Sequence, residues 1–249
     1  MDMKGLQILN GYYLGLLCLI WSLIGCQQMP VERNATKGNA QFDVGELQWW
    51  RVSFEVAWDK KNQPAWYVGP LLADQIISPA LKQNEKNIVL WRFHRRAAAD
   101  ETGHRFTFLC FTDATIFSNI QADINNSVVL QKLLLNKQVL RVDAGGLGGK
   151  EAALIDATSD KAWSPAMQKT WPYFLMGSSK MWLEQIHIAT ETLELEAFVE
   201  GGDQVTLLAR YKLVHDIVSR HWIYEGQHAL LHHLSALYGY QPIHLRQHF

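Results

Sequence analysis

The sequence predicts an α+β fold: a ferredoxin-like antiparallel sheet with helices on one face, followed by a mostly helical C-terminal subdomain. Two observations predict it. Residues 47–143 contain four segments with strand periodicity, with helical segments between the first and second strands and between the third and fourth. That order is typical of the split β-α-β motif. After residue 150, apolar residues recur at helical spacings.

The strands are predicted from alternation of side chains. In the first, Leu47–Trp58, aromatic residues such as Trp50 and Phe54 share one side, while polar residues such as Arg51 and Glu55 share the other. Three further strands are predicted at residues 88–96, 105–112 and 138–143. The second and third of the four are separated by a loop containing Asp100 and Gly103, which predicts a hairpin.

Helices are predicted at residues 66–81, from Asp113 as N-cap through Ile120, and at 128–135. The glycine-rich run 144–149 predicts a loop, and it marks the boundary between an α+β subdomain, 47–145, and a helical subdomain, 150–249. Within the latter, residues 165–195 are helical with interruptions at Pro172 and Gly177, and two helices follow at 205–219, behind Asp203 as N-cap, and at 222–238.

Composition narrows the class of protein. The chain has 249 residues, a formal net charge of −1, 48% apolar residues and ten tryptophans. This predicts a substantial core, and nothing in the charge steers the protein toward nucleic acid. Of the three cysteines, Cys110 stands among Phe106, Phe108 and Phe111. We expect its thiol to be buried.

The N-terminus has the layout of a secretory signal. Lys4 precedes an apolar run that ends in Leu23-Ile24-Gly25-Cys26, which resembles the lipobox of bacterial lipoproteins. The resemblance implies a signal peptide over 1–25, cleavage before Cys26, and diacylglycerol and a palmitate-type fatty acid on that cysteine. The alternative is an uncleaved anchor, but the apolar run is about fifteen residues, short of the roughly twenty that span a bilayer.

The residues after Cys26 predict the location of the protein and a tether to the membrane. Gln27 follows the cysteine, and this position resembles that of bacterial lipoproteins that travel to the outer membrane. The resemblance implies a lipid-anchored protein on the periplasmic face of that membrane. Residues 26–46 mix polar residues without a period and predict a flexible tether.

A basic hairpin is the candidate binding site. Arg92, His94 and Arg96 share one side of the second strand, and His104 and Arg105 open the third. Such a face could bind an anionic group, with arginine in bidentate fashion. Alternatively, these cations only keep an open sheet face solvated and pair with neighbouring carboxylates.

The same hairpin resembles the C-terminal elimination domain of lantibiotic dehydratases and related thiopeptide-type proteins. The resemblance rests on the aromatic-Arg strand, the His-containing strand after it, segment 163–173, and Leu230-Leu231-His232-His233. It implies that His104 and Arg105 match a His-Leu-Arg strand and that His232 matches a functional histidine. Pro165-Ala166 lacks the family's glutamate, and Thr170-Trp171-Pro172 stands in place of Arg-Tyr-Gly. The resemblance therefore implies a fold more than an elimination activity.

No other motif indicates chemistry. His228 and His232 have the i, i+4 spacing of a metal pair, but no further ligand motif accompanies them, and we expect neither a metal nor a cofactor. No nucleophile motif is present. The sequence favours a non-catalytic structural or interaction component of an envelope assembly, for which a secretion or export system is a candidate, with envelope protein partners. The alternative is an envelope enzyme or ligand-binding lipoprotein that uses Arg92, His94 and His104.

Overall fold

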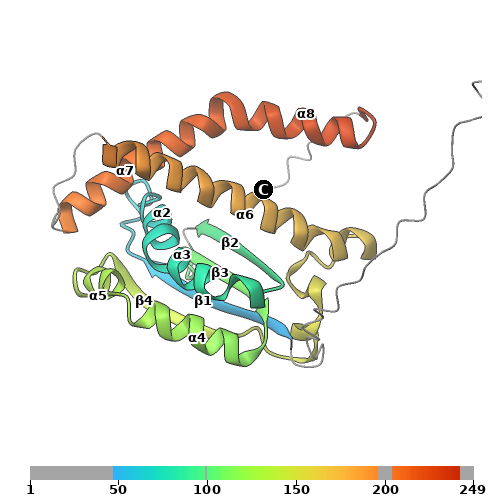
Figure 1. The fold of residues 1–249 in the computed structure, drawn as a ribbon, viewed down its shortest axis with the longest axis horizontal. Helices are drawn as coiled ribbons and strands as arrows, with labels where there is room; N and C mark the ends of the chain where they lie inside the picture. The colour runs from blue at the N-terminus through green and yellow to red at the C-terminus, as the bar shows by residue number, and fades with distance from the viewer. Residues whose placement is uncertain (1–46, 99, 196–203, 242–249) are drawn as a thin grey trace, which may run out of the picture. The chain divides into compact units, whose positions relative to one another are not determined.

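The computed structural model describes residues 47–98, 100–195 and 204–241. The predicted signal peptide, the tether with Cys26, and the Asp203 cap lie outside these residues. The elements run in the order β1 (Gln48–Val56), α2 (Val68–Leu72), η1 (Ala73–Ile77), α3 (Ser78–Asn84), η2 (Glu85–Asn87), β2 (Leu90–Ala97), β3 (His104–Thr112), α4 (Ala114–Asn125), α5 (Val128–Leu135), β4 (Val139–Gly146), η3 (Lys150–Ala153), η4 (Ile155–Thr158), α6 (Pro165–Leu195), α7 (Gln204–His221), η5 (Trp222–Gly226) and α8 (Gln227–Leu237) (Figure 1).

The four strands form one antiparallel sheet in the order β2-β3-β1-β4. The predicted α+β class is therefore confirmed. In the register of the central pair, Phe54 lies opposite Phe106 and Val52 opposite Phe108. Because successive side chains point to opposite faces, this register brings the apolar residues of both strands to one face.

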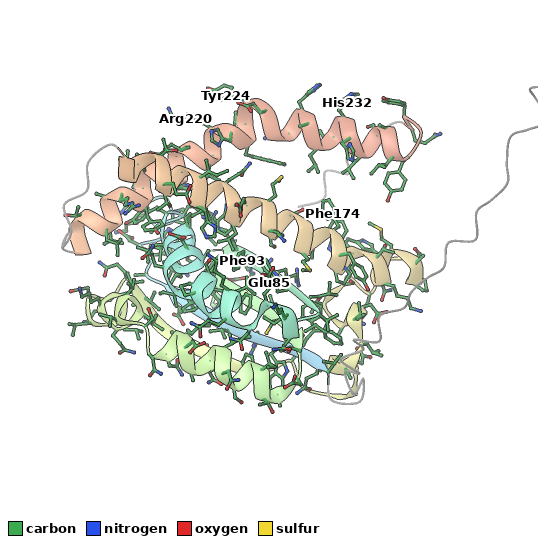
Figure 2. The ribbon with its side chains drawn as sticks, viewed as in Figure 1. Glu85, Phe93, Phe174, Arg220, Tyr224 and His232 are labelled. Carbon is green, nitrogen blue, oxygen red and sulfur yellow. The ribbon has the colours of Figure 1, made fainter. Side chains whose placement is uncertain are left out.

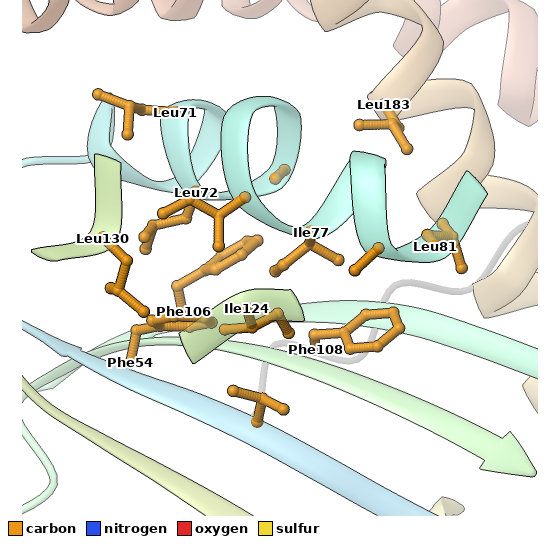
Figure 3. Packing of buried hydrophobic residues seen from close by; sticks show 14 of the residues in the cluster. Phe54, Leu71, Leu72, Ile77, Leu81, Phe106, Phe108, Ile124, Leu130 and Leu183 are labelled. Atoms are coloured by element: carbon orange, nitrogen blue, oxygen red, sulfur yellow. The ribbon is translucent and has the colours of Figure 1, made fainter. Parts of the chain in front are cut away.

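The main hydrophobic core lies between that face and the helices. Phe54, Phe106 and Phe108 from the sheet are at most 1% exposed and belong to one cluster with residues of several helices (Figure 3). The helices contribute Leu72 from α2, Ile77 from η1, Ile124 from α4, Leu130 from α5 and Leu183 from α6. Cys110 is fully buried in the same cluster, as predicted. Burial raises the pKa of its thiol, so the thiolate is not formed at neutral pH.

Helix α6 covers the outer edge of β2. The backbone N–H of Phe93 donates a hydrogen bond of 3.0 Å to the Oγ of Ser179, a position that another strand would otherwise use. The ring of Trp182 meets the ring of Phe93 edge-on at 5.5 Å between centroids. This edge of the sheet is therefore capped by a helical side chain, and the long helix is fastened to the strand.

Helix α6 also differs from its prediction, because it runs through Pro172 without a break. A proline within a helix leaves the carbonyl four residues earlier without its N–H partner. That carbonyl belongs to Gln168, and the hydroxyl of Ser159 donates to it at 2.7 Å. The cost of Pro172 is thereby reduced by a residue outside the helix.

Two helical runs contain a π-helical turn. Residues 68–84 are helical throughout with η1 in the middle, and residues 204–237 are helical throughout with η5 between α7 and α8. The two helices predicted at 205–219 and 222–238 are thus one run. Gly226 is required at the second π turn, since a Cβ there would lie 2.9 Å from the ring of Trp222. Such turns are frequent at functional sites.

A small second cluster lies on the other face of the sheet, at one end. Trp49, Leu109 and Phe111 are buried there beneath the short helices η3 and η4, and the indole N–H of Trp49 donates to the carbonyl of Ile155 at 3.0 Å. Among the helices of the described ranges, none combines the length and the apolar character needed to cross a membrane.

Candidate functional site

The structure divides the predicted basic hairpin between two faces of the sheet. In the β2–β3 register, Arg96 lies opposite Arg105 and Ala97 opposite His104. Arg92, His94, Arg96 and Arg105 therefore share the polar face, while His104 points to the opposite face and is only 4% exposed. His94 and His104 do not form one site.

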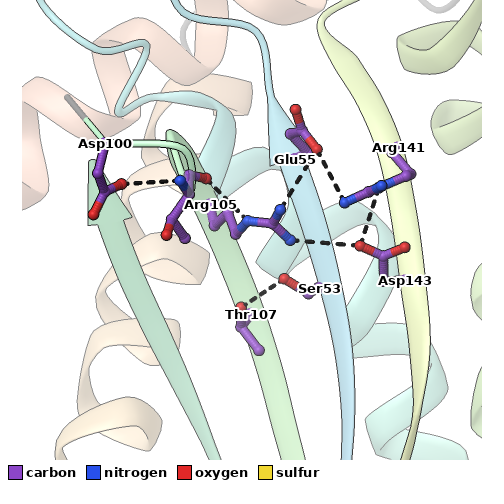
Figure 4. A network of polar contacts seen from close by, with 8 residues as sticks. Ser53, Glu55, Asp100, Arg105, Thr107, Arg141 and Asp143 are labelled. Carbon is purple, nitrogen blue, oxygen red and sulfur yellow. Dashed lines mark hydrogen bonds and ion pairs between the residues drawn. The ribbon is translucent and has the colours of Figure 1, made fainter. Parts of the chain in front are cut away.

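On the polar face, most arginines already have oxygen partners. Arg105 lies 3.6 Å from Glu55 and 3.4 Å from Asp143, and Arg141 contacts the same two carboxylates at 3.5 and 3.1 Å (Figure 4). Arg96 forms an ion pair with Asp100. Exposed pairs of this kind contribute about 0–1 kcal/mol each to stability.

Of the predicted hairpin residues on this face, Arg92 and His94 have no carboxylate partner among the described residues. Arg92 donates to the carbonyl of Thr158 at 3.5 Å, and burial lowers its pKa. Partial burial of the ring, and then the charges of Arg92 and Arg96, lower the pKa of His94, so its imidazole is neutral at neutral pH. The predicted role in anion binding stays a prediction for these two residues.

A second basic centre lies on the helix-covered face, around Arg95. Its guanidinium carbon is 5.1 Å from the ring centroid of Trp66 and 5.2 Å from that of Trp182, so the cation lies between two indoles. Arg95 also donates to the backbone carbonyl of Trp66. Gly69 permits this approach, because a Cβ there would lie 3.1 Å from the Nε of Arg95.

Arg95 has no carboxylate partner among the residues that the structure describes. Burial lowers its pKa to about 10, because keeping the cation away from water is unfavourable. Burying an unpaired charge costs several kcal/mol, and each cation–π contact returns only about 0.5–2 kcal/mol.

Two histidines near Arg95 are neutral, first because of burial and secondly because of the charge of Arg95. Burial, and secondly the charge of Arg95, lower the pKa of His104 to about 4. The same two causes, in the same order, lower the pKa of His215, although Asp216 opposes them. The Nδ1 of His104 is buried without a hydrogen-bond partner, and the ring packs edge-on against Trp66 at 5.0 Å. Both imidazoles are therefore neutral at neutral pH, and Arg95 carries the charge of this centre.

Arg95 faces a cavity of about 590 Å³ between α6 and the α7–η5–α8 run. Its walls are mainly apolar and come from Leu175 and Met181 of α6, Val218 of α7, Trp222 and Ile223 of η5, and Leu230 of α8. Phe174, which also lines it, is labelled on α6 in Figure 2. Small-molecule sites have volumes of about 300–1,000 Å³ and mostly apolar walls with few polar groups. The size and lining of this cavity fit that description.

A further polar cluster joins three helical runs around Asp74. The hydroxyl of Tyr211 and the amide of Gln75 both donate to Asp74, and the Nε2 of His187 lies 3.2 Å from its other oxygen. Ser78 Oγ also lies 3.2 Å from that Nε2. In a nucleophilic triad the serine and the carboxylate contact opposite nitrogens of the imidazole. Since Ser78 and Asp74 approach the same nitrogen, this cluster holds helices together and is not a triad.

Within the described ranges, no three histidine, cysteine or acidic residues come together in an arrangement that could hold a metal ion. His228 and His232, the predicted i, i+4 pair, lie with ring centroids 5.8 Å apart.

Comparisons of the chain with protein-family models, with curated proteins and with solved structures found no match. The capabilities of the site therefore follow from its own geometry.

Sequence reasoning missed Arg95 and its partners. The available signal was a cation on the same side of the second strand as Trp91 and Phe93, an apolar side. Trp66 and Trp182 could not be assigned to it, because they lie far away in the sequence and meet only when α2 and α6 pack on the sheet.

Proposed function

We propose that the protein is an outer-membrane lipoprotein of the periplasmic face, a non-catalytic component of an envelope protein assembly. The proposal draws its location from the lipobox-like sequence that ends at Cys26. Lipid attachment by two acyl signals gives stable anchoring where one chain is marginal. A secretion or export system is the candidate assembly within this proposal.

The observation that carries the interaction role is an apolar stripe along η5 and α8. Tyr224, Leu231 and Tyr238 follow each other at intervals of seven residues, and Tyr224 and Tyr238 are 77% and 73% exposed. Seven residues make almost two α-helical turns, so Leu231 and Tyr238 lie close to one line, and the π turn that contains Tyr224 displaces this residue from that line. Figure 2 shows Tyr224 on the side of the helix away from α6. An exposed stripe of this kind suits packing against an apolar protein surface.

The finer description of the fold belongs to the same proposal. We propose a ferredoxin-like sheet with helices on one face, and a helical subdomain over residues 150–249. Support comes from the strand order β2-β3-β1-β4 and from the helical residues that share one core cluster with β1 and β3. The likeness of the hairpin to the elimination domain of lantibiotic dehydratases is also kept as a proposal about the fold.

Changing Cys26 to serine should abolish acylation and leave the precursor uncut, because the sulfur of Cys26 is the atom that accepts the diacylglycerol. The measurement is the size of the protein and its distribution between membrane fractions. A variant that still reaches mature size in the outer membrane would refute the lipoprotein reading.

The double variant Tyr224→Ser and Tyr238→Ser should remove the partners that co-purify with the detergent-solubilised protein. Raising the salt concentration should have little effect on co-purification of the wild type, since an apolar contact depends little on screened charges. Tyr173→Ser is a matched control, because this tyrosine is 56% exposed on α6. Partner loss in the control as well, or in neither variant, would contradict the assignment of this stripe.

The alternative is an envelope enzyme or ligand-binding lipoprotein that uses the basic hairpin. One observation favours it: Arg92 and His94 lack carboxylate partners among the described residues. His104 is left out of the test, because its side chain is buried on the other face. If Arg92→Ala with His94→Ala abolishes complementation of a deletion strain while the complex still co-purifies, the enzyme reading replaces the interaction reading.

A further inference from the structure

The partly buried cation of Arg95 faces an apolar cavity that is large enough for a ligand. Arg95 uses one Nη2 N–H on the carbonyl of Trp66, and no carboxylate among the described residues meets its guanidinium. A guanidinium offers five N–H donors in a planar fork. Several of them thus remain for an acceptor that enters the cavity.

The walls limit the rest of the ligand. Beyond Arg95, aliphatic and aromatic side chains of α6, α7, η5 and α8 dominate the lining. The polar groups that remain include the hydroxyls of Ser178 and Ser219 and the imidazole of His215. They include no carboxylate that would attract a cationic group. A ligand that fills this space therefore has one anionic end and a long apolar part.

We propose that the cavity between α6 and the α7–η5–α8 run binds a single-chain anionic amphiphile, with its carboxylate or phosphate on Arg95 and its hydrocarbon chain against Met181, Trp222 and Leu230. The two indoles of Trp66 and Trp182 hold the guanidinium in place before the ligand arrives. Such pre-organisation lowers the cost of binding. The proposal goes beyond the interaction role, which uses the outer side of the same helix.

The site also selects against other chemistries. An amphiphilic cation would be repelled by Arg95 and would find no carboxylate among the described lining residues. An uncharged ester would keep the apolar contacts but would not neutralise the cation. Charge-assisted hydrogen bonds are roughly twice as strong as neutral ones, so the anion is preferred to both.

The test is photolabelling of the full-length protein in its native membrane. Four dodecyl probes carry a diazirine near the end of the chain and differ only in the head: carboxylate, phosphate, methyl ester and trimethylammonium. After irradiation, peptide mass spectrometry locates the labelled residues. We expect the anionic probes to label the segments around Met181, Trp222 and Leu230, and the ester and ammonium probes to label them at least about tenfold less. The stronger of the two anionic probes tells whether a fatty acid or a phosphate-bearing lipid is the ligand.

Variants separate the head from the chain. Arg95→Met should reduce labelling of these segments by about tenfold or more, whereas Arg220→Met, an exposed cation on α7 outside the cavity lining, should not. Leu230→Trp keeps Arg95 and fills space for the chain, so it should block labelling even if the Arg95 variant fails to fold. Equal labelling by the ammonium probe, or unchanged labelling of both cavity variants, would overturn the proposal.

Discussion

Replacement of Phe106 by alanine is expected to lower the free energy of unfolding by about 3–5 kcal/mol. Phe106 is 1% exposed, and its ring centroid lies 5.3 Å from that of Phe93, 6.3 Å from Phe54 and 6.1 Å from Trp182. It therefore contacts two neighbouring strands and the long helix α6 together. Its removal leaves a cavity that these rigid neighbours cannot close.

Chemical denaturation followed by far-UV circular dichroism measures this change. Tyr173→Ala, on the exposed side of α6, is the control and should alter stability by less than about 0.5 kcal/mol. A loss below about 1 kcal/mol for the Phe106 variant would show that the sheet and α6 do not share the core described here.

The stability of the protein should fall by about 2 kcal/mol as the pH is lowered from about 6.5 to about 4, through His104 alone. The folded protein holds this imidazole neutral, with its pKa near 4, because burial and the charge of Arg95 oppose protonation. The unfolded chain takes up the proton near pH 6.5. Between these values the unfolded state binds more protons, so stability rises with pH. The full shift would give about 3.4 kcal/mol, and the change between these two pH values is smaller because the titrations extend beyond both of them.

The measurement is unfolding free energy at several pH values for the wild type and for His104→Gln. The variant should lose the part of the pH dependence that His104 causes, whatever its absolute stability. His233→Gln, at an exposed position of α8, is the control and should keep the wild-type slope. An unchanged slope in the His104 variant would mean that this side chain is solvated in the folded state.

Much of the fold could be predicted because its signals are local. Alternation located all four strands, and Asp113 was correctly assigned as an N-cap, since its carboxylate accepts from the N–H of Ile116 at 2.9 Å. The helix at residues 128–135 was placed at its observed bounds. These features depend on neighbours within a few residues, which is why one sequence suffices to find them.

The errors arose where a distant residue decides the outcome. Pro172 was predicted to interrupt a helix, but the hydroxyl of Ser159 meets the carbonyl that the proline leaves free. His94 and His104 were grouped in one site, but the hairpin register places them on opposite faces. The loop between the strands sets that register, and its geometry could not be predicted from the sequence. A shift of the register by one residue exchanges the two faces. The Arg95 centre could not be predicted, because its two indoles are far apart in the sequence: Trp66 lies in the turn before α2 and Trp182 in α6.

The contact between Phe93 and Ser179 can form only after α6 has been synthesised. Strand β2 is made well before α6, so its outer edge stays open while the intervening chain emerges. An open edge can pair with the same strand of another copy. When α6 arrives, its serine hydroxyl takes the backbone N–H of Phe93 and its tryptophan covers the neighbouring ring. The nascent chain can therefore self-associate along this edge during this interval, until docking of α6 covers it.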